Sequence, residues 1–298
     1  MSSSYGSQRP SMRQVVMRRA APRSARPTGR NRGARLLVAV AMAAFALISF
    51  FGSQVYNPVT GEDQYINITQ EQEIALGFQA APEMARQFGG EEPDAEAQAV
   101  VDFVGERLVQ NSIAGQTDYP FEFTLLADDQ TVNAFALPGG PIFVTDALFS
   151  RLQTEGQLAG VLGHEIGHVV GRHGAERIAQ QELQQGLTGA LVMATYDPND
   201  PGTQRTTQVA LLIGQLVTMQ YGRDDELQSD MLGVRFMAKA GYDPRAMISV
   251  MEILAVAGGG QETPEFFSTH PNPDNRIQRI EEAIRALYPD GVPDGLIQ

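Results

Sequence analysis

The amino-acid sequence predicts a mainly helical α+β fold with one small sheet. After residue 69, most segments carry apolar residues every three or four positions, the spacing of amphipathic helices. Only three short segments, all between residues 121 and 145, have the composition of strands. Hydrophobic residues make up 43% of the 298 residues, enough for a sizeable core. Cysteine is absent, which excludes disulfides, a thiol nucleophile and Cys-ligated zinc.

Charge is distributed unevenly along the chain. Residues 1–35 contain nine Arg and no Asp or Glu, and they lack apolar periodicity, so we expect a disordered basic segment. Residues 36–298 hold 13 basic and 35 acidic residues, a net charge of −22. A body this acidic repels nucleic acid, so no nucleic-acid partner is expected.

An apolar run without charged residues follows, from Leu36 to Phe51, and Gly52 and Ser53 extend it. Residues 36–53 are predicted to form a signal-anchor transmembrane helix. The basic head would then lie in the cytosol and the acidic body outside it, as the positive-inside rule requires. A cleaved signal peptide, a mitochondrial transit peptide and a buried core helix are the alternatives.

The next elements are a linker and two helices. Residues 54–68 contain the turn signals Asn57-Pro58 and Thr60-Gly61 and are expected to form a linker. A helix is predicted from Thr69, which opens a capping box with Gln72, to about Phe88. A second helix is predicted over residues 95–110, with one apolar stripe made of Val100, Val104 and Leu108.

Strands are predicted at residues 121–126, 133–137 and 142–145. Two prolines and two glycines at residues 138–141 are expected to prevent a regular ladder between the last two. This region is either a surface loop between strands or an edge strand beside a cleft. In the second case the edge strand, made of Asn133, Ala134, Phe135 and Ala136, would pair with the backbone of an extended substrate if the motif in the following helix forms an active site.

The helix predicted after Thr154 carries His164-Glu165-x-x-His168. Residues four apart lie on one helix face, so His164 and His168 can point at one metal ion. Glu165 leaves the same helix at another angle and can reach a water molecule at that metal. Glycines at 156, 160, 163 and 167 indicate that this helix is buried and packs closely on its neighbours.

A third histidine in this region, His173, is one residue short of the metzincin spacing, so we expect it at a helix end instead, where its charge would complement the helix dipole. Residues 175–195 and 207–220 are predicted to form a soluble helical hairpin that covers the active-site helix. A membrane hairpin is disfavoured because the second apolar stretch is short and glutamines interrupt the region.

A further helix is predicted from about residue 223 to Ala240, closed by Gly241. Glu226 and Asp230 are four residues apart and face one way. Either this is an acidic, solvated face, or Glu226 is the third zinc ligand and Asp230 accepts a hydrogen bond from the outer nitrogen of a ligand histidine.

Four stretches in this order resemble the membrane-linked zinc metallopeptidases that include the CAAX prenyl protease and HtpX: HEIGHVVGRH, E226-x-x-x-D230, NAFALPGG and STHPNPDNRI. The resemblance covers about residues 65–288 and is closest to the single-pass or periplasmic quality-control branch, without tetratricopeptide repeats. It implies a gluzincin-type domain over residues 69–298. It also implies roles for His270, as oxyanion donor or latent fourth zinc ligand, and for Arg276, as a neighbour of the oxyanion or a structural ion-pair partner.

The sequence and the resemblance together predict a zinc-dependent endopeptidase, with one Zn²⁺ per chain, that acts on membrane-associated or misfolded envelope polypeptides. It is expected to be a single-pass protein with its catalytic domain on the extracytoplasmic, periplasmic side. The mitochondrial inner membrane, or a soluble periplasmic form after signal cleavage, is the alternative. The rival functions are a membrane-anchored chaperone or scaffold with structural zinc and a partner-binding adaptor.

Overall fold

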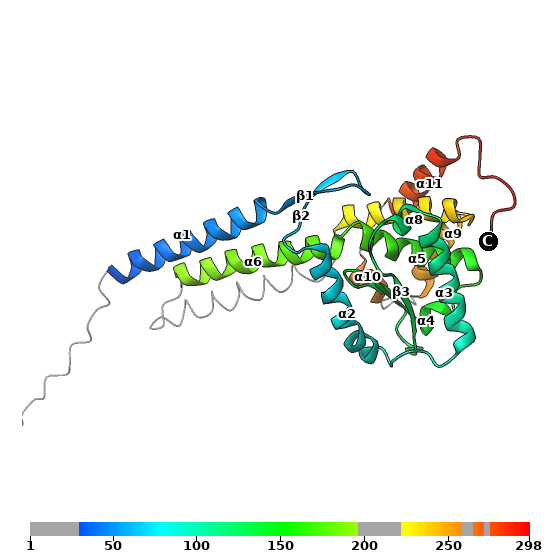
Figure 1. Ribbon diagram of the computed structural model, residues 1–298, viewed down its shortest axis with the longest axis horizontal. Coiled ribbons are helices and arrows are strands. Elements are labelled where there is room, and N and C mark those ends of the chain that lie inside the picture. The colour runs from blue at the N-terminus through cyan, green and yellow to red at the C-terminus, as the bar shows by residue number, and fades with distance from the viewer. Residues whose placement is uncertain (1–29, 196–221, 258–264, 271–274) are drawn as a thin grey trace, which may run out of the picture.

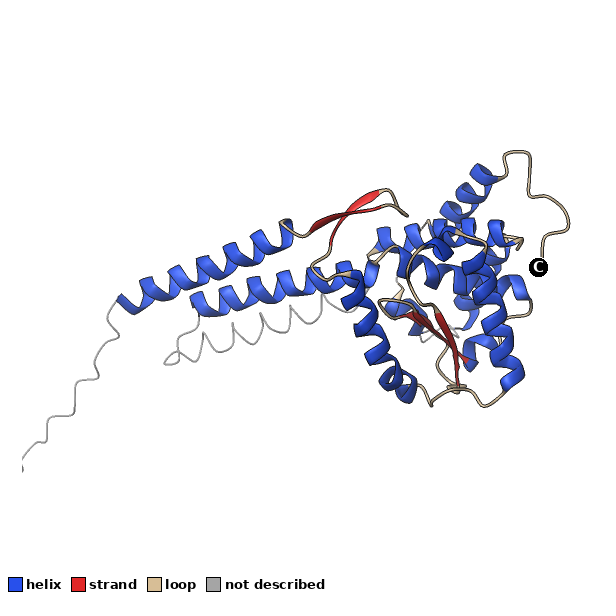
Figure 2. Cartoon of the chain, viewed as in Figure 1, coloured by secondary structure: helices blue, strands red, loops and turns tan. Residues whose placement is uncertain are grey.

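The computed structural model describes residues 30–195, 222–257, 265–270 and 275–298, and it confirms the mainly helical fold (Figures 1 and 2). The expectations for residues 1–29 and 207–220 fall outside these residues. The helices are α1 (Arg30–Phe51), α2 (Gln70–Gln87), α3 (Ala95–Gln110), α4 (Asp146–Phe149), α5 (Glu155–Val170), α6 (His173–Thr195), α8 (Arg223–Ala240), α9 (Ala246–Ala257), α10 (Glu265–Thr269) and α11 (Arg276–Leu287). The strands are β1 (Gln54–Asn57), β2 (Glu62–Tyr65), β3 (Glu122–Leu126), β4 (Ala134–Ala136) and β5 (Pro141–Thr145), and a 3₁₀ turn covers Ile113–Gln116.

The apolar helix α1 begins at Arg30, so residues 30–35, which were expected to be disordered, are helical. The long apolar segment provides the helix nucleus, and adding good helix formers such as Arg and Ala to an existing helix costs little. Gly33–Phe51 has a mean hydropathy of 2.2 and is long and apolar enough to cross a membrane.

Residues 54–68 form a hairpin rather than a plain linker. Strands β1 and β2 pair antiparallel, with Gln54 opposite Tyr65. The chain turns at the predicted turn signals, and Gly61, at φ +78°, donates its N–H to the Asn57 carbonyl at 2.8 Å. The strands lack apolar alternation. The hairpin is held instead by two buried amide side chains, Asn57 and Gln64, which reach the end of α5.

The central sheet has the order β3-β5-β4, with β3 parallel and β4 antiparallel to β5. The expectation that residues 138–141 prevent a regular ladder is wrong, because Phe135 pairs with Phe143 across a tight turn. Gly139 and Gly140 have φ of +85° and +130°, which lets the turn close. The turn packs on α2, where a Cβ on Gly139 would lie 2.3 Å from the Ile74 Cα. The outer position of β4 in the sheet agrees with the edge-strand prediction.

The helices flanking the sheet agree with the sequence in most details. The predicted capping box of Thr69 and Gln72 is present. At the start of α5, the Thr154 hydroxyl accepts from the Gln157 N–H, and the Gln157 side chain accepts from the Gln153 N–H. Helix α3 buries Val101, Val104 and Leu108, whereas Val100 is 45% exposed. The predicted stripe was therefore displaced by one residue at its start.

Helix α5 lies in the middle of the body, among α3, α8 and α9 (Figure 1). All residues from Gly156 to Val170 are buried, as the glycine pattern predicted. A Cβ on Gly163 would lie 3.3 Å from the Gly233 Cα, and one on Gly167 would lie 3.0 Å from the Ser229 Cα. Small residues on both helices thus let α8 approach α5 closely.

The prediction that the helix after residue 175 covers the active-site helix is wrong. Helix α5 ends at Val170 with Gly171 as its C-cap residue, Arg172 adopts φ +57°, and the chain turns sharply into α6. Figure 1 shows that α6 then leaves the body and runs beside α1. Helix α8 ends as predicted, with Gly241 in the left-handed conformation.

Candidate metal centre

Two ring nitrogens from α5 meet as the sequence predicts. The Nε2 atoms of His164 and His168 lie 3.1 Å apart, and both side chains are buried. Their spacing of four residues places them on one face of the helix. The rigid, fully buried helix fixes the direction in which both rings point.

A carboxylate from α8 joins the two imidazoles. Glu226 places Oε2 3.4 Å from His164 Nε2 and Oε1 3.4 Å from His168 Nε2. Glu226 and Asp230 are 0% and 1% exposed, so the alternative of an acidic, solvated face is wrong for them. Asp224, on the other side of the helix, is exposed.

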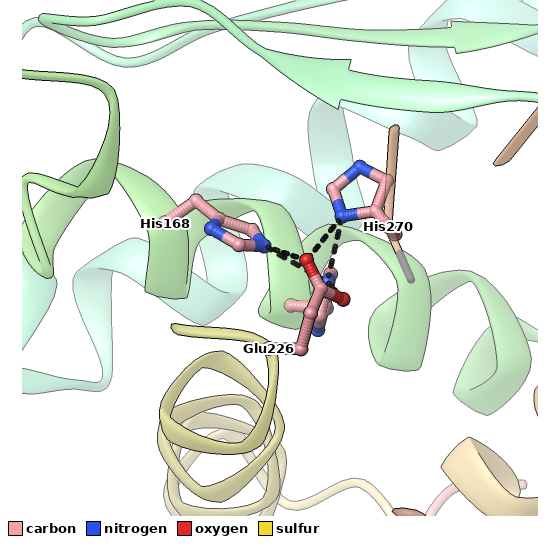
Figure 3. Close-up of side chains that lie close together, drawn as sticks. His168, Glu226 and His270 are labelled. Carbon is pink, nitrogen blue, oxygen red and sulfur yellow. Dashed lines mark hydrogen bonds and ion pairs between the residues drawn. The ribbon is translucent and has the colours of Figure 1, made fainter. Parts of the chain in front are cut away.

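His270 completes the cluster from the end of α10 (Figure 3). Its Nδ1 lies 3.3 Å from His164 Nε2 and 3.0 Å from Glu226 Oε1. Its other ring nitrogen, Nε2, lies 3.6 Å from Glu165 Oε1. The imidazole therefore lies between the cluster and the Glu165 carboxylate.

The geometry of this cluster fits a four-coordinate metal ion. One atom each from His164, His168, Glu226 and His270 lies within 4.8 Å of the others, and the closest pairs are separated by 3.0 to 3.4 Å. In a tetrahedral zinc site with bonds of about 2.0–2.1 Å, ligand atoms lie about 3.3 Å apart. Three imidazoles and one carboxylate favour zinc or another late transition metal over Mg²⁺ or Ca²⁺.

Asp230 contacts the outer nitrogen of His164, as predicted. Its Oδ1 lies 2.9 Å from His164 Nδ1. Arg276, only 1% exposed, donates Nε to Asp230 Oδ2 at 2.7 Å and places Nη1 3.2 Å from Glu226 Oε2. These contacts agree with the ion-pair alternative for Arg276.

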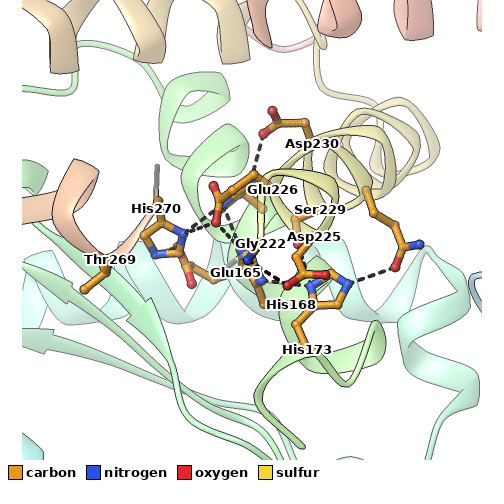
Figure 4. Close-up of polar contacts among 12 residues, drawn as sticks. Glu165, His168, His173, Gly222, Asp225, Glu226, Ser229, Asp230, Thr269 and His270 are labelled. Atoms are coloured by element: carbon orange, nitrogen blue, oxygen red, sulfur yellow. Dashed lines mark hydrogen bonds and ion pairs between the residues drawn. The ribbon is translucent and has the colours of Figure 1, made fainter. Parts of the chain in front are cut away.

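The outer nitrogen of His168 has a partner that the sequence did not reveal. His173 places its Nδ1 2.9 Å from His168 Nδ1 and its Nε2 2.8 Å from Gln228 Oε1 (Figure 4 labels the two histidines). The Gln228 carbonyl oxygen can only accept, so His173 carries its proton on Nε2. Its Nδ1 then accepts from His168 Nδ1–H, which directs the His168 Nε2 lone pair into the cluster.

The expectation of a charged His173 at a helix C-terminus is therefore wrong. His173 begins α6, is 2% exposed, and burial lowers its pKa. The left-handed Arg172 turns the chain so that His173 folds back onto His168. Nothing in the residue spacing predicts that turn, because a non-glycine residue seldom adopts it.

The protonation states in the metal-free cluster follow from burial and contact. Burial opposes a charge on His164, but hydrogen bonds to Asp230 and Glu226 outweigh it and raise the His164 pKa to about 9. Burial lowers the His168 pKa well below its usual value. Burial also opposes the Glu226 charge, yet electrostatic attraction to the His270 ring and hydrogen bonds from the neighbouring histidines hold the Glu226 pKa well below its usual value.

Glu165 is the one carboxylate here that is poised to accept a proton. It is 0% exposed, and neither oxygen has a hydrogen bond within the described part of the chain. Burial raises the pKa of Glu165. A buried carboxylate without hydrogen-bond donors binds a proton more readily than an exposed one, as a general base must.

The predicted edge strand lies close to this cluster. Strand β4 contacts α5 and α10, and the Phe266 N–H donates to the Val132 carbonyl at 3.3 Å. Asn133 and the three residues of β4 are all buried. The Oδ1 of Asn133 has no hydrogen-bond partner within the described residues.

Comparisons with known proteins agree with this geometry. Residues 95–284 match the model of peptidase family M48. The chain is 30% identical over 200 residues to the beta-barrel assembly-enhancing proteases of Yersinia pestis and Escherichia coli K12, covering 63% of this chain and 39% of each relative. It is 27% identical over 245 residues to the mitochondrial metalloendopeptidase OMA1 of Schizosaccharomyces pombe, covering 81% of this chain and 70% of that protein. The chain thus spans well under half the length of the bacterial relatives. With most of its length matched, the chain belongs to peptidase family M48.

Proposed function

We propose that this protein is a zinc-dependent endopeptidase. The observation that carries the proposal is the convergence of His164, His168 and Glu226 on one point. Beside it lies the buried Glu165 carboxylate, which has no hydrogen bond to any described residue. The family supports peptidase chemistry, and the donor set supports zinc.

His164, His168 and Glu226 would hold one zinc ion, which supplies Lewis acidity to water and to the scissile carbonyl. Glu165 acts as the general base: it removes a proton from the attacking water and later delivers it to the leaving amine nitrogen. Asp230 and His173 each orient the outer nitrogen of one ligand histidine. Arg276 holds Asp230 and compensates the buried negative charge.

His270 has two successive roles in this proposal. Its Nδ1 occupies the fourth corner of the cluster, which makes the described arrangement a resting state. Four protein ligands are typical of closed zinc sites, whereas catalytic sites keep one position open. When the imidazole withdraws from that corner, its N–H can donate to the oxyanion of the tetrahedral intermediate.

Substrate would bind as an added strand along β4. On the side of β4 that faces β5, the Asn133 carbonyl accepts from the Thr145 N–H, and the Leu137 N–H donates to the Pro141 carbonyl. Because hydrogen bonding alternates along an antiparallel strand, the N–H and C=O groups of Ala134 and Ala136 point to the opposite edge. An extended peptide can pair there, and Asn133 can add a side-chain contact.

The substrates we propose are misfolded or membrane-associated polypeptides. The names of the relatives place those proteins in beta-barrel assembly and in mitochondria. Helix α1 would anchor this chain in a membrane, with the basic segment on the cytosolic side and the catalytic body on the extracytoplasmic side. Insertion into the mitochondrial inner membrane would use the same helix.

The test compares the wild-type protein with Glu165→Gln. The variant should retain one zinc ion per chain but cleave casein at least about 100-fold more slowly, because the base is lost. Glu106→Gln, an exposed residue on α3, should behave as wild type. Undiminished cleavage by Glu165→Gln would rule out this mechanism.

The closed four-residue arrangement also supports a second candidate, a scaffold or chaperone with structural zinc. That function predicts that the wild-type protein holds zinc yet never cleaves casein. It also predicts that a His270→Ala variant, with one ligand removed, gains no activity.

A further inference from the structure

Helices α1 and α6 pack antiparallel and closely along their length (Figure 1). A Cβ on Gly186 would lie 2.6 Å from the Ala46 Cβ, and one on Gly189 would lie 3.4 Å from the Met42 Cε. Small residues at such contacts allow two helix backbones to approach each other, as is common for helices packed within membranes.

The contacts fix which parts of the two helices lie side by side. A cavity between them is lined by Ser53 and Asn67 near the body together with Ala179 and Glu182, and the Asn67 amide donates to Glu182. Farther out, Gly186 faces Ala46 and Gly189 faces Met42. The remaining turns of α6 therefore run beside the apolar part of α1 that begins at Leu36.

The outer part of α6 lacks charged residues, like the apolar part of α1, and its polar residues are Gln184, Gln185, Thr188 and Thr195. All charged residues of α6 lie between residues 173 and 182, and none follows from Leu183 to Thr195. Leu187 and Met193 are 37% and 39% exposed, beside a helix on which Phe45 is 74% exposed. Contiguous apolar surface of this kind marks a face that contacts a protein or a membrane.

We propose that Leu183–Thr195 enters the same membrane as α1, so that α1 and the outer half of α6 form one lipid-embedded unit. The exposed apolar face of outer α6 contacts lipid hydrocarbon, because it lies beside α1, which is apolar enough to span a bilayer. The proposal rests on the proposed anchoring by α1. These 13 residues extend about 20 Å, so this part of α6 penetrates a core about 30 Å thick without crossing it.

An aromatic cluster lies at the expected membrane surface. The rings of Phe50 and Tyr65 stack with centroids 4.7 Å apart, and Phe51 packs edge-on against Tyr65. Both Phe residues end α1, and Phe50 also lines the cavity that contains Glu182. Tyr is one of the residues enriched at the bilayer interface. Glu182, the last charged residue of α6, lines the same cavity as Phe50 and therefore lies at this level.

This arrangement specifies the distance from the membrane to the metal centre. Helix α6 begins at His173, which contacts His168, and reaches Leu183 after about 15 Å of helix rise. An extended chain covers this distance in about five residues. The substrate class is therefore membrane proteins with an extended segment next to their membrane span, cut within about ten residues of the bilayer.

The absence of cysteine allows a clean labelling test. Single-cysteine variants of the full chain are placed in phosphatidylcholine–phosphatidylglycerol vesicles and exposed to a membrane-impermeant maleimide, before and after detergent is added. Met193→Cys, on outer α6, and Phe45→Cys, on α1, should react only in detergent. Gln180→Cys, an exposed residue of α6 nearer the body, should react in both conditions. Zinc content verifies that each variant is folded.

The outcomes separate this inference from the anchoring itself. Protection of Phe45→Cys with free labelling of Met193→Cys would overturn the embedding of α6 and leave the anchor intact. Free labelling of both would overturn the proposed anchoring by α1. For the substrate class, a reporter with one transmembrane helix and a long casein segment is cleaved and the cuts are mapped. Cuts should cluster within about ten residues of the span, and uniformly distributed cuts would contradict the assigned distance.

Discussion

Removing the His173 imidazole should weaken zinc binding although His173 is not a ligand. In the His173→Ala variant, the buried Nδ1–H of His168 loses its acceptor, which now lies 2.9 Å away. A buried donor without a partner costs about 1–3 kcal/mol. At about 1.4 kcal/mol per factor of ten, the zinc dissociation constant should rise about 5- to 150-fold. This agrees with the usual effect of outer partners of metal ligands, about 10- to 100-fold.

The assay is competition for zinc between the detergent-solubilised full chain and a chromophoric chelator. The visible absorption of the cobalt-substituted protein provides a second readout, because a reoriented His168 changes the ligand field. His173→Asn is the matched variant, since its amide oxygen can accept where the imidazole Nδ1 accepts, and it should recover most of the affinity. Gln180→Ala, exposed on the same helix, should leave both readouts unchanged.

Wild-type zinc affinity and an unchanged cobalt spectrum in His173→Ala would contradict this role of His173. The role is also contradicted if His173→Asn is as weak as His173→Ala, because the acceptor would then not be the relevant feature.

Three further changes test other parts of the structure. First, the metal-free His164 has a pKa of about 9, so zinc must displace a proton from it below that pH. The apparent association constant for zinc should therefore rise about tenfold per pH unit between pH 6 and 8 and level off above pH 9. Chelator titrations that show no pH dependence would contradict this. Second, Asn57→Ala removes a buried amide that donates to the Val170 carbonyl at 2.9 Å. The free energy of unfolding should fall by about 1–3 kcal/mol in denaturant titrations. The control Gln54→Ala, at an exposed position, should change it by less than about 0.5 kcal/mol. Third, Gly167→Ala places a Cβ 3.0 Å from the Ser229 Cα and should push α8 away from α5. Thermal unfolding should show that the free energy of unfolding falls by about 1–3 kcal/mol. Wild-type stability would show that α5 and α8 pack less closely than described.

Local patterns allowed much of the geometry of the candidate metal centre to be predicted. His164 and His168 are brought together by the pitch of one helix, which residue spacing reveals directly. The same pitch places Glu226 and Asp230 on one face of α8, but only the fold buries that face. The glycines of α5 indicated close packing, and they do lie against α8.

The parts that sequence analysis missed depend on contacts between distant segments. The hairpin at residues 54–65 has no strand-like pattern, because it is held by Asn57 and Gln64 on the last carbonyls of α5. The position of His173 depends on the left-handed Arg172. The path of α6 along α1 depends on close contacts, such as Gly186 on Ala46, that no periodicity encodes.

The central claim is that the buried cluster is the metal centre of a peptidase, and a stoichiometric zinc titration with casein cleavage as the readout tests it most directly. The protein is stripped of metal by a chelator, and zinc is returned in fractions of an equivalent. Cleavage should be absent at the start, rise linearly and stop at one zinc ion per chain, while His164→Ala should neither bind this equivalent nor cleave. Cleavage by the metal-free protein, or full zinc binding without any cleavage, would contradict the claim.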